Sequence, residues 1–146
     1  MFDSFQIDTD LSPILNAISQ LQGKLDNQTP LMTKIGGYIV ERAERGFETE
    51  TDPYGSKWQP LSPATIVEKQ RKGYPNKILT RTGRLANSFR ILVRGNSVRI
   101  ASTVGYSRYH QIGTKKMAKR AMLPGSKLSA KDESNVVAMS VEYIDI

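Results

Sequence analysis

Two short segments joined by Gly95-Asn96 constrain the fold of this chain more than any other part of its sequence. Residues 89–94 (FRILVR) and 97–102 (SVRIAS) carry apolar side chains at alternate positions, which is typical of strands with one buried face. A two-residue connection that begins with glycine favours a type II′ turn. The resulting register places no two like charges opposite each other, and its apolar face pairs Val93 with Val98 and Ile91 with Ile100. We therefore predict an antiparallel hairpin.

Three Ser-Pro or Thr-Pro pairs mark the start of segments with the apolar spacing of helices. A Ser or Thr at the N-cap accepts a hydrogen bond from an otherwise unpaired backbone N–H, and proline suits the first helical position. After each of the first two pairs, apolar residues recur three or four positions apart. The sequence thus predicts helices over 13–26, 30–46 and 63–72, capped by Ser12, Thr29 and Ser62.

The remaining elements complete an α+β fold. Residues 4–8 give a candidate first strand, and Ser129 is placed to cap a helix over 130–143, with a strand as the alternative. The apolar side of this helix is expected to hold Val136, Val137, Val141 and Ile144. Gly36-Gly37 costs on the order of 1 kcal/mol per glycine inside the second helix, and we interpret the pair as a close packing point in preference to a hinge.

We predict one domain over residues 1–146, in which the first two helices pack a small antiparallel sheet. Long extended loops at 47–61 and 106–127 are expected to reach neighbouring molecules. A chain of 146 residues can bury enough surface to fold without cross-links, and it contains no cysteine. Neither a signal peptide nor an apolar run of about 20 residues is present, which indicates a soluble cytoplasmic product with no membrane partner.

Residues that carry chemistry are scarce, so we predict that the chain is not an enzyme. His110 is the only histidine, and Glu68 is the only acid between residues 56 and 131. A catalytic triad or a histidine-based metal site needs more partners than this. Neither of the glycine-rich nucleotide-binding motifs occurs. We therefore assign no catalytic residue, no metal ligand and no cofactor.

Charge divides the chain into three parts. Residues 1–55 carry nine acids and four bases, a net charge of −5, whereas residues 56–131 carry 17 bases and one acid, a net charge of +16. Residues 132–146 carry four acids and no base, and the whole chain has a net charge of +7. Such asymmetry implies an electrostatic partner for the middle part. That partner is an acidic protein in the first interpretation and nucleic acid in the second.

Several aromatic and basic residues of the two long loops are candidates for contacts with partners. Trp and Tyr are enriched at the energetic centres of interfaces. For Trp58 a place in the core under its own loop is the alternative, and it is slightly favoured, whereas Tyr54 is assigned to an interface. The full set of interface candidates comprises Tyr54, Trp58, Arg108, Tyr109, Lys115, Lys116, Lys119 and Arg120. Reversing the charge of its last four members is expected to weaken assembly and to leave the fold intact.

A series of short motifs, taken in order, resembles the phage virion morphogenesis family. The first is Phe47-x-x-Glu50-x-Asp52-Pro53-x-Gly55-x-x-Trp58, and the second is Thr82-Gly83-x-Leu85-x-x-Ser88. Tyr106-x-x-Tyr109-His110-Gln111-x-Gly113 and Pro124-Gly125 follow the hairpin. The family includes the Mu-like G-type protein and the tail completion proteins of contractile-tailed phages, and the resemblance covers about residues 5–143. It implies structural roles for Phe47, Asp52, Pro53, Gly55, Thr82, Gly83, Leu85, His110, Gly113 and Pro124.

The resemblance also implies a function. Members are structural proteins of the virion, so the chain is expected to complete the tail or to join it to the head in a neck ring. The implied partners are further copies of the chain, commonly six in a ring, other neck, connector and tail proteins, and packaged DNA. One departure is that Met122-Leu123 stands before Pro124, where members often carry arginine. The alternative function is a small, non-specific DNA-binding protein that uses the basic middle part.

Overall fold

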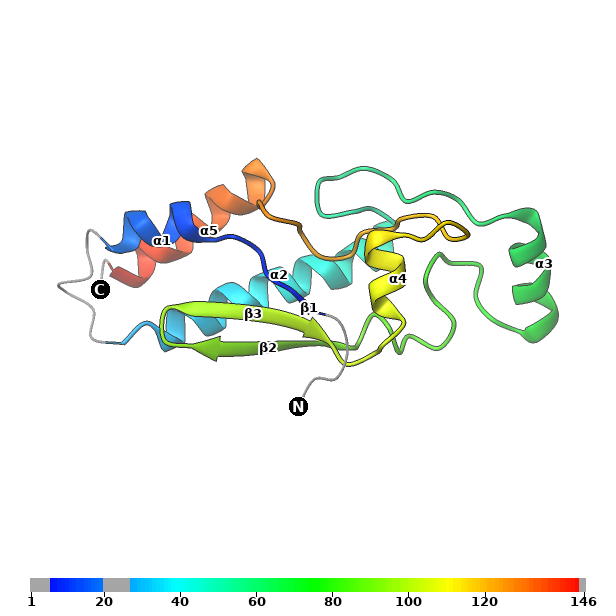
Figure 1. The fold of residues 1–146 in the computed structure, drawn as a ribbon, viewed down its shortest axis with the longest axis horizontal. Helices are drawn as coiled ribbons and strands as arrows, with labels where there is room; N and C mark the ends of the chain where they lie inside the picture. Colours follow the sequence, from blue (N-terminus) through cyan, green and yellow to red (C-terminus); the bar gives the residue numbers. More distant parts are fainter. Residues whose placement is uncertain (1–5, 20–26, 145–146) are drawn as a thin grey trace.

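The computed structural model describes residues 6–19 and 27–144, and this part of the chain has the predicted α+β fold (Figure 1). One antiparallel sheet has the strand order β1-β3-β2. Its strands are β1 (Gln6–Ile7), β2 (Phe89–Arg94) and β3 (Ser97–Ser102). The helices are α1 (Ser12–Ser19), α2 (Thr29–Thr49), α3 (Pro63–Lys72), α4 (Ser107–Ile112) and α5 (Ala130–Ile144).

The β2–β3 hairpin has the predicted register. Val93 lies opposite Val98 and Ile91 opposite Ile100. Gly95 has a φ of 57°, the left-handed conformation that glycine provides at the first position of a type II′ turn. β1 adds to β3 through Ile7, which pairs with Ile100. The first strand is thus present at residues 6–7, whereas residues 4 and 5 of its predicted range lie outside the described part.

α2 lies along the hairpin and supplies much of the core (Figure 1). Its buried side comprises Leu31, Met32, Ile35, Gly36, Ile39, Ala43, Gly46 and Phe47. A Cβ atom on Gly36 would lie 2.7 Å from a methyl group of Ile91 and 2.8 Å from one of Val98. The interpretation of this glycine as a packing point is therefore confirmed, because the helix can approach the sheet only where no side chain intervenes. A Cβ atom on Gly37 would meet nothing within 4 Å.

The ends of the first two helices differ from the prediction. α2 continues to Thr49, so residues 47–49 of the predicted loop are helical, because Phe47 extends the buried side one turn beyond Ala43. Ser12 and Thr29 are the first residues of their helices and not N-caps; Asp10 Oδ1 and Asn27 Oδ1 accept their backbone N–H groups at 2.9 and 3.0 Å. The α1 prediction extended to residue 26, and residues 20–26 lie outside the described part.

The third and last helices begin as predicted. Ser62 accepts the N–H of Thr65 at 3.2 Å, and Ser129 Oγ accepts that of Asp132 at 3.1 Å. The predicted buried side of α5 is confirmed for Val136 and for the partly buried Ile144 and is wrong for Val137 and Val141, which are exposed, while Asp132 and Ser140 are buried instead. The reason is that Asp132 is buried against α2, where its Oδ1 accepts hydrogen bonds from Tyr38 Oη (2.6 Å) and Arg42 Nε (3.0 Å).

The helices are not distributed as predicted. α2 alone makes extensive contact with the hairpin, while α1 packs beside α5 at one end of the elongated molecule (Figure 1). α3 stands at the opposite end. α4 forms within the region 106–127 that was predicted to be a loop, and the remainder of that region has no regular structure. The molecule is therefore a sheet-and-helix body that extends into a loop-rich end around α3 and α4.

Candidate interaction surface

The segment after α2 is a structured turn. Asp52 Oδ1 accepts the N–H groups of Tyr54 (2.8 Å) and Ser56 (2.9 Å), and the Asp52 carbonyl accepts that of Gly55 (3.1 Å). Gly55 has a φ of 93°, which L side chains rarely adopt. Pro53 is buried, and its carbonyl accepts Arg42 Nη2 at 3.2 Å. The D-P-x-G part of the motif thus shapes the chain at the loop-rich end.

Trp58 lies in the core, with only 4% of its surface exposed. Its ring meets that of Phe47 edge to face at 5.3 Å between centroids, and its Nε1 donates to the Ala121 carbonyl at 2.8 Å. Of the two roles considered for Trp58, the structure therefore favours the core. Its assignment to an interface is corrected, because the buried indole offers a partner almost no surface.

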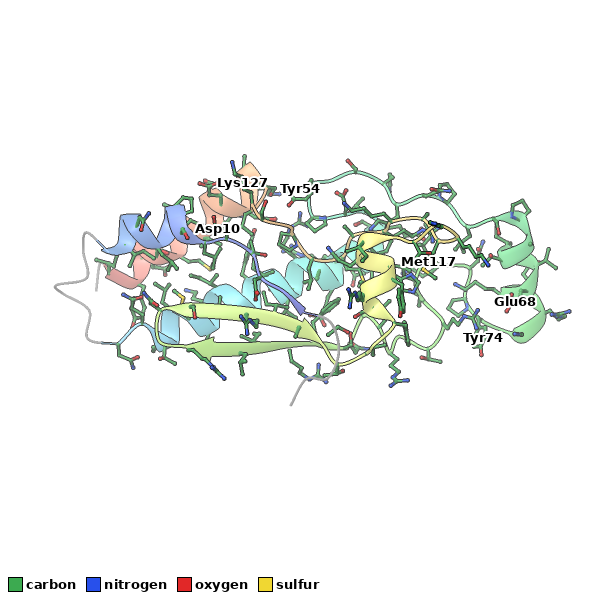
Figure 2. The ribbon with its side chains drawn as sticks, viewed as in Figure 1. Asp10, Tyr54, Glu68, Tyr74, Met117 and Lys127 are labelled. Atoms are coloured by element: carbon green, nitrogen blue, oxygen red, sulfur yellow. The ribbon has the colours of Figure 1, made fainter. Side chains whose placement is uncertain are left out.

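The two long loops are fastened to each other. Tyr54 Oη donates to the Lys127 carbonyl (2.7 Å) and accepts the N–H of Gly125 (2.9 Å), and Figure 2 shows Tyr54 beside Lys127. Tyr54 nevertheless keeps 51% of its surface exposed. Its hydroxyl therefore serves the fold, while its ring remains open to a partner.

Gln111 holds the later loop from inside, and the sequence analysis gave it no role of its own. Its Oε1 accepts the N–H groups of Met122 (2.8 Å) and Leu123 (3.1 Å), while its Nε2 donates to the Leu123 carbonyl (2.8 Å). Pro124, which follows, is also buried. The Met122-Leu123 pair that precedes Pro124 is buried as well.

Arg120 is part of the fold, in contrast to the predicted role in docking. Its Nε donates to the Gln59 carbonyl at 2.8 Å and its Nη2 to the Pro60 carbonyl at 3.1 Å. Its backbone N–H donates to the His110 carbonyl at 2.7 Å. Burial lowers the pKa of Arg120. We therefore now expect a charge reversal at Arg120 to disturb the fold, in contrast to the prediction made from the sequence, because the carbonyls of Gln59 and Pro60 would lose their donor.

The T-G-x-L segment forms a chain of tight turns. Gly83 has a φ of 83°, and its carbonyl accepts both the backbone and the side-chain N–H groups of Asn87. Leu85 is buried, and its carbonyl accepts Ser88 Oγ at 2.6 Å. Thr82 stays exposed and accepts the N–H of Arg84 at 3.4 Å. Leu85 thus anchors the turn in the core and leaves its basic residues outside.

These segments enclose a cleft of about 730 Å³ between α3 and α4, which we call the basic cleft. Met117 marks its position in Figure 2. The walls come from five segments that lie far apart in the sequence: 59–62, α3, 79–85, α4 with the preceding Tyr106, and 116–120. The cationic residues that line it are Lys69, Arg81, Arg84, Lys116 and Arg120, and its lining contains no carboxylate.

Two of these cations are fixed by backbone carbonyls and one by a carboxylate. Lys69 is buried and donates to the carbonyls of Lys77 and Thr80; burial, with a smaller contribution from Arg81, lowers its pKa. Arg120 donates to the carbonyls of Gln59 and Pro60. Arg81 lies 3.5 Å from Glu68, which pairs more closely with Lys72 at 2.9 Å. Arg84 and Lys116 are exposed, and neither side chain forms an ion pair with another residue of the described part of the chain.

His110 lines the same cleft. Its ring meets Tyr106 edge to face at 6.1 Å, and its Nδ1 is buried without a hydrogen-bond partner among the described residues. Burial first, and the nearby Arg120 second, lower its pKa. Gly113 ends α4 with a φ of 76°, and a Cβ atom there would lie 3.0 Å from the Lys119 backbone nitrogen.

The remaining interface candidates lie on the surface of α4 and the loop after it. Arg108, Tyr109, Lys115 and Lys119 are exposed. Ile112 adds an exposed apolar side chain next to them. Of the eight predicted interface residues, six are thus exposed, whereas Trp58 and Arg120 are held within the fold.

Within residues 6–19 and 27–144, no group of three or more His, Cys, Asp or Glu side chains is arranged to hold a metal ion. None of the helices in this part of the chain combines the length and the apolar character that crossing a membrane requires.

Comparison with known proteins gave two matches. Residues 9–140 match the sequence profile of the phage virion morphogenesis family. The chain is also 31% identical, over 116 residues, to "Mu-like prophage FluMu G protein 1" of Haemophilus influenzae. This match covers 78% of the present chain and 79% of the relative. No solved structure matches the chain.

Proposed function

Since the chain belongs to the phage virion morphogenesis family, we propose that it completes the tail of a phage or prophage particle or joins that tail to the head. A role in virion assembly follows from the family itself. The finer role at the neck or tail end is the proposal, as is a ring of copies, six being the expected number. Its further partners would be neck, connector and tail proteins.

The observation that carries this proposal is the position of the basic cleft within the matched segment. Residues 9–140 include all five segments that enclose the cleft and both of the fastened loops. Two of the cleft's cations are held by backbone carbonyls, so they keep their positions before a partner arrives. Preorganised, charged surfaces of this kind favour fast and selective docking.

The interface proposed for the copies or their virion partners consists of the exposed members of the predicted set. These are Tyr54, Arg108, Tyr109, Lys115, Lys116 and Lys119. The partly apolar rings of Tyr54 and Tyr109 can be buried at low entropic cost. Lys116 lines the basic cleft, and Lys115 and Lys119 are exposed on the segment after α4. Packaged DNA that passes through a ring would meet the same positive surface.

Deletion of the gene, followed by electron microscopy of the particles, tests the proposal. We expect DNA-filled heads and separate tails, and we expect that a plasmid copy of the gene restores joined particles. If the deletion strain makes joined, infectious particles of normal appearance, the proposed role is wrong. Separated heads and tails that the plasmid copy does not rejoin would also contradict it.

A further inference from the structure

We infer that the basic cleft receives the side chains of Glu41, Glu44 and Glu48, on α2 of a second copy of the chain. The inference deepens the proposed function, on which it rests, because it names the surfaces that would join copies in a ring. The described residues that line the cleft include five cationic side chains and no carboxylate. Arg81 has Glu68 beside it at 3.5 Å, whereas Arg84 and Lys116 form no ion pair among residues 6–19 and 27–144. The repulsion among these like charges favours the entry of an anionic group.

The form of the cleft favours carboxylate side chains over nucleic acid. Its volume of about 730 Å³ is in the range of pockets that enclose small groups. Leu61, Leu79 and Tyr106 contribute apolar surface between the cations. A DNA duplex carries its phosphates on a convex outer surface, so it would contact the rim and leave the interior empty. Clusters of basic side chains that surround such a recess recognise acidic motifs in proteins.

The chain itself presents a matching acidic motif. Glu41, Glu44 and Glu48 are exposed on α2 at positions three and four residues apart, which places them on one side of the helix along about 10 Å. Among residues 6–19 and 27–144, none of the three has a partner in an ion pair. We call this set the acidic stripe. Two basic residues, Arg42 and Arg45, lie on the same part of the helix; Arg42 pairs with Asp132, and Arg45 is exposed.

The two surfaces lie on different parts of the molecule. The acidic stripe is on α2, whereas α3, α4 and three loop segments enclose the basic cleft (Figure 1). When the acidic stripe of one copy occupies the basic cleft of another, the pair still has one free cleft and one free stripe. Such a head-to-tail contact forms a ring when the rotation between successive copies closes, and an open filament when it does not.

A pair of charge-reversed variants tests this arrangement. The cleft variant is Arg84→Glu/Lys116→Glu, which changes only exposed cleft residues whose side chains hold nothing in the fold. The stripe variant is Glu41→Lys/Glu44→Lys/Glu48→Lys. We expect sedimentation velocity to show oligomers of the wild-type chain and monomers of each variant alone, with association at least about tenfold weaker.

An equimolar mixture of the two variants gives the decisive result. The cleft variant keeps an intact stripe and the stripe variant keeps an intact cleft, so one contact between them survives. We therefore expect pairs that contain one copy of each variant and grow no further. A mixture that stays monomeric, or variants that assemble separately as the wild type does, would overturn the inference.

The control variant is Arg94→Glu/Lys131→Glu, which changes the net charge as the cleft variant does but at exposed sites outside the cleft. It should assemble as the wild type does, and its loss of assembly would show that net charge alone matters. Wild-type chain that is monomeric at every concentration, from about 0.1 M to about 1 M salt, would also overturn the inference.

The outcome separates this inference from the proposed function. If the cleft and stripe variants still form rings and restore joined particles to the deletion strain, the named surfaces are wrong and the proposed function stands. If the deletion strain joins its heads to its tails without this protein, the proposed function is wrong, whatever the variants do. If the cleft variant loses affinity for duplex DNA but assembles normally, the cleft serves nucleic acid and the inference is wrong.

Discussion

The Arg120 guanidinium donates to the carbonyls of Gln59 and Pro60, and this decides what a substitution there does. Hydrogen bonds from charged groups contribute about 1.5–3 kcal/mol, so Arg120→Ala should lower the free energy of unfolding by about that amount. Lys115→Ala and Lys119→Ala, at exposed sites, should change it by less than about 0.5 kcal/mol. Urea unfolding of the three variants measures the difference. Equal stability of all three would show that the carbonyl contacts are unimportant.

His110 should make stability depend on pH. Its pKa in the folded chain lies below the value of about 6.5 expected when unfolded, chiefly because the ring is buried. Above about pH 6.5 the ring is neutral in both states. As the pH falls from there toward the lower folded pKa, the unfolded chain binds the proton first, so the free energy of unfolding decreases.

The variant His110→Gln isolates this effect, since glutamine does not titrate. We expect its free energy of unfolding to fall less than that of the wild type between about pH 7 and about pH 5. Carboxylates titrate in both proteins and cancel in the comparison. Identical pH dependence of the two proteins, measured by thermal unfolding, would contradict the burial of the ring.

Trp58 and Arg120 show what sequence can reveal about single residues. Trp58 was weighed between core and interface, and the choice depended on Phe47 and the Ala121 carbonyl, which lies 63 residues away. Arg120 stands among lysines in the sequence, and nothing local distinguishes a guanidinium that reaches back to Gln59. Partners so distant along the chain leave no pattern near the residue itself.

Among the elements, α2 offers a matched pair of substitutions. Alanine at Gly36 would press a methyl group against Ile91 and Val98, whereas alanine at Gly37 would meet open space. Overpacking costs about 1–3 kcal/mol and helix propensity returns about 1 kcal/mol, so Gly36→Ala should destabilise the chain by up to about 2 kcal/mol. Gly37→Ala should stabilise it by up to about 1 kcal/mol. Thermal unfolding that gives the same change for both would show that α2 does not approach the sheet closely.

Elements defined by local rules were predictable. The hairpin register followed from alternate apolar positions and a glycine turn, and the start of α3 from Ser62-Pro63. α4 has only six residues, too few for a periodic pattern. The buried side of α5 was partly misjudged because it begins with a carboxylate, Asp132, which lies in the first turn and meets Arg42 from α2. Where a buried ion pair lies on the inner side of a helix, apolar residues alone do not identify that side.

For the whole molecule, the charge distribution predicts how the chain treats DNA. A concave cleft cannot follow the duplex, so we expect weak, non-specific binding with a Kd of about 10⁻⁴–10⁻⁶ M that weakens steeply with salt. Fluorescence titration of a labelled duplex across salt concentrations measures this. Tight binding that persists at about 1 M salt would instead favour the DNA-binding alternative.

Because the two loops are joined to each other, the basic cleft is completed late in translation. Residues 59–62 leave the ribosome long before residues 116–120, yet both belong to the same cleft and are joined by Arg120. The growing polypeptide therefore has no completed recess to offer until most of it has been made. On the inferred arrangement, an unfinished chain therefore cannot yet receive the acidic stripe of another copy.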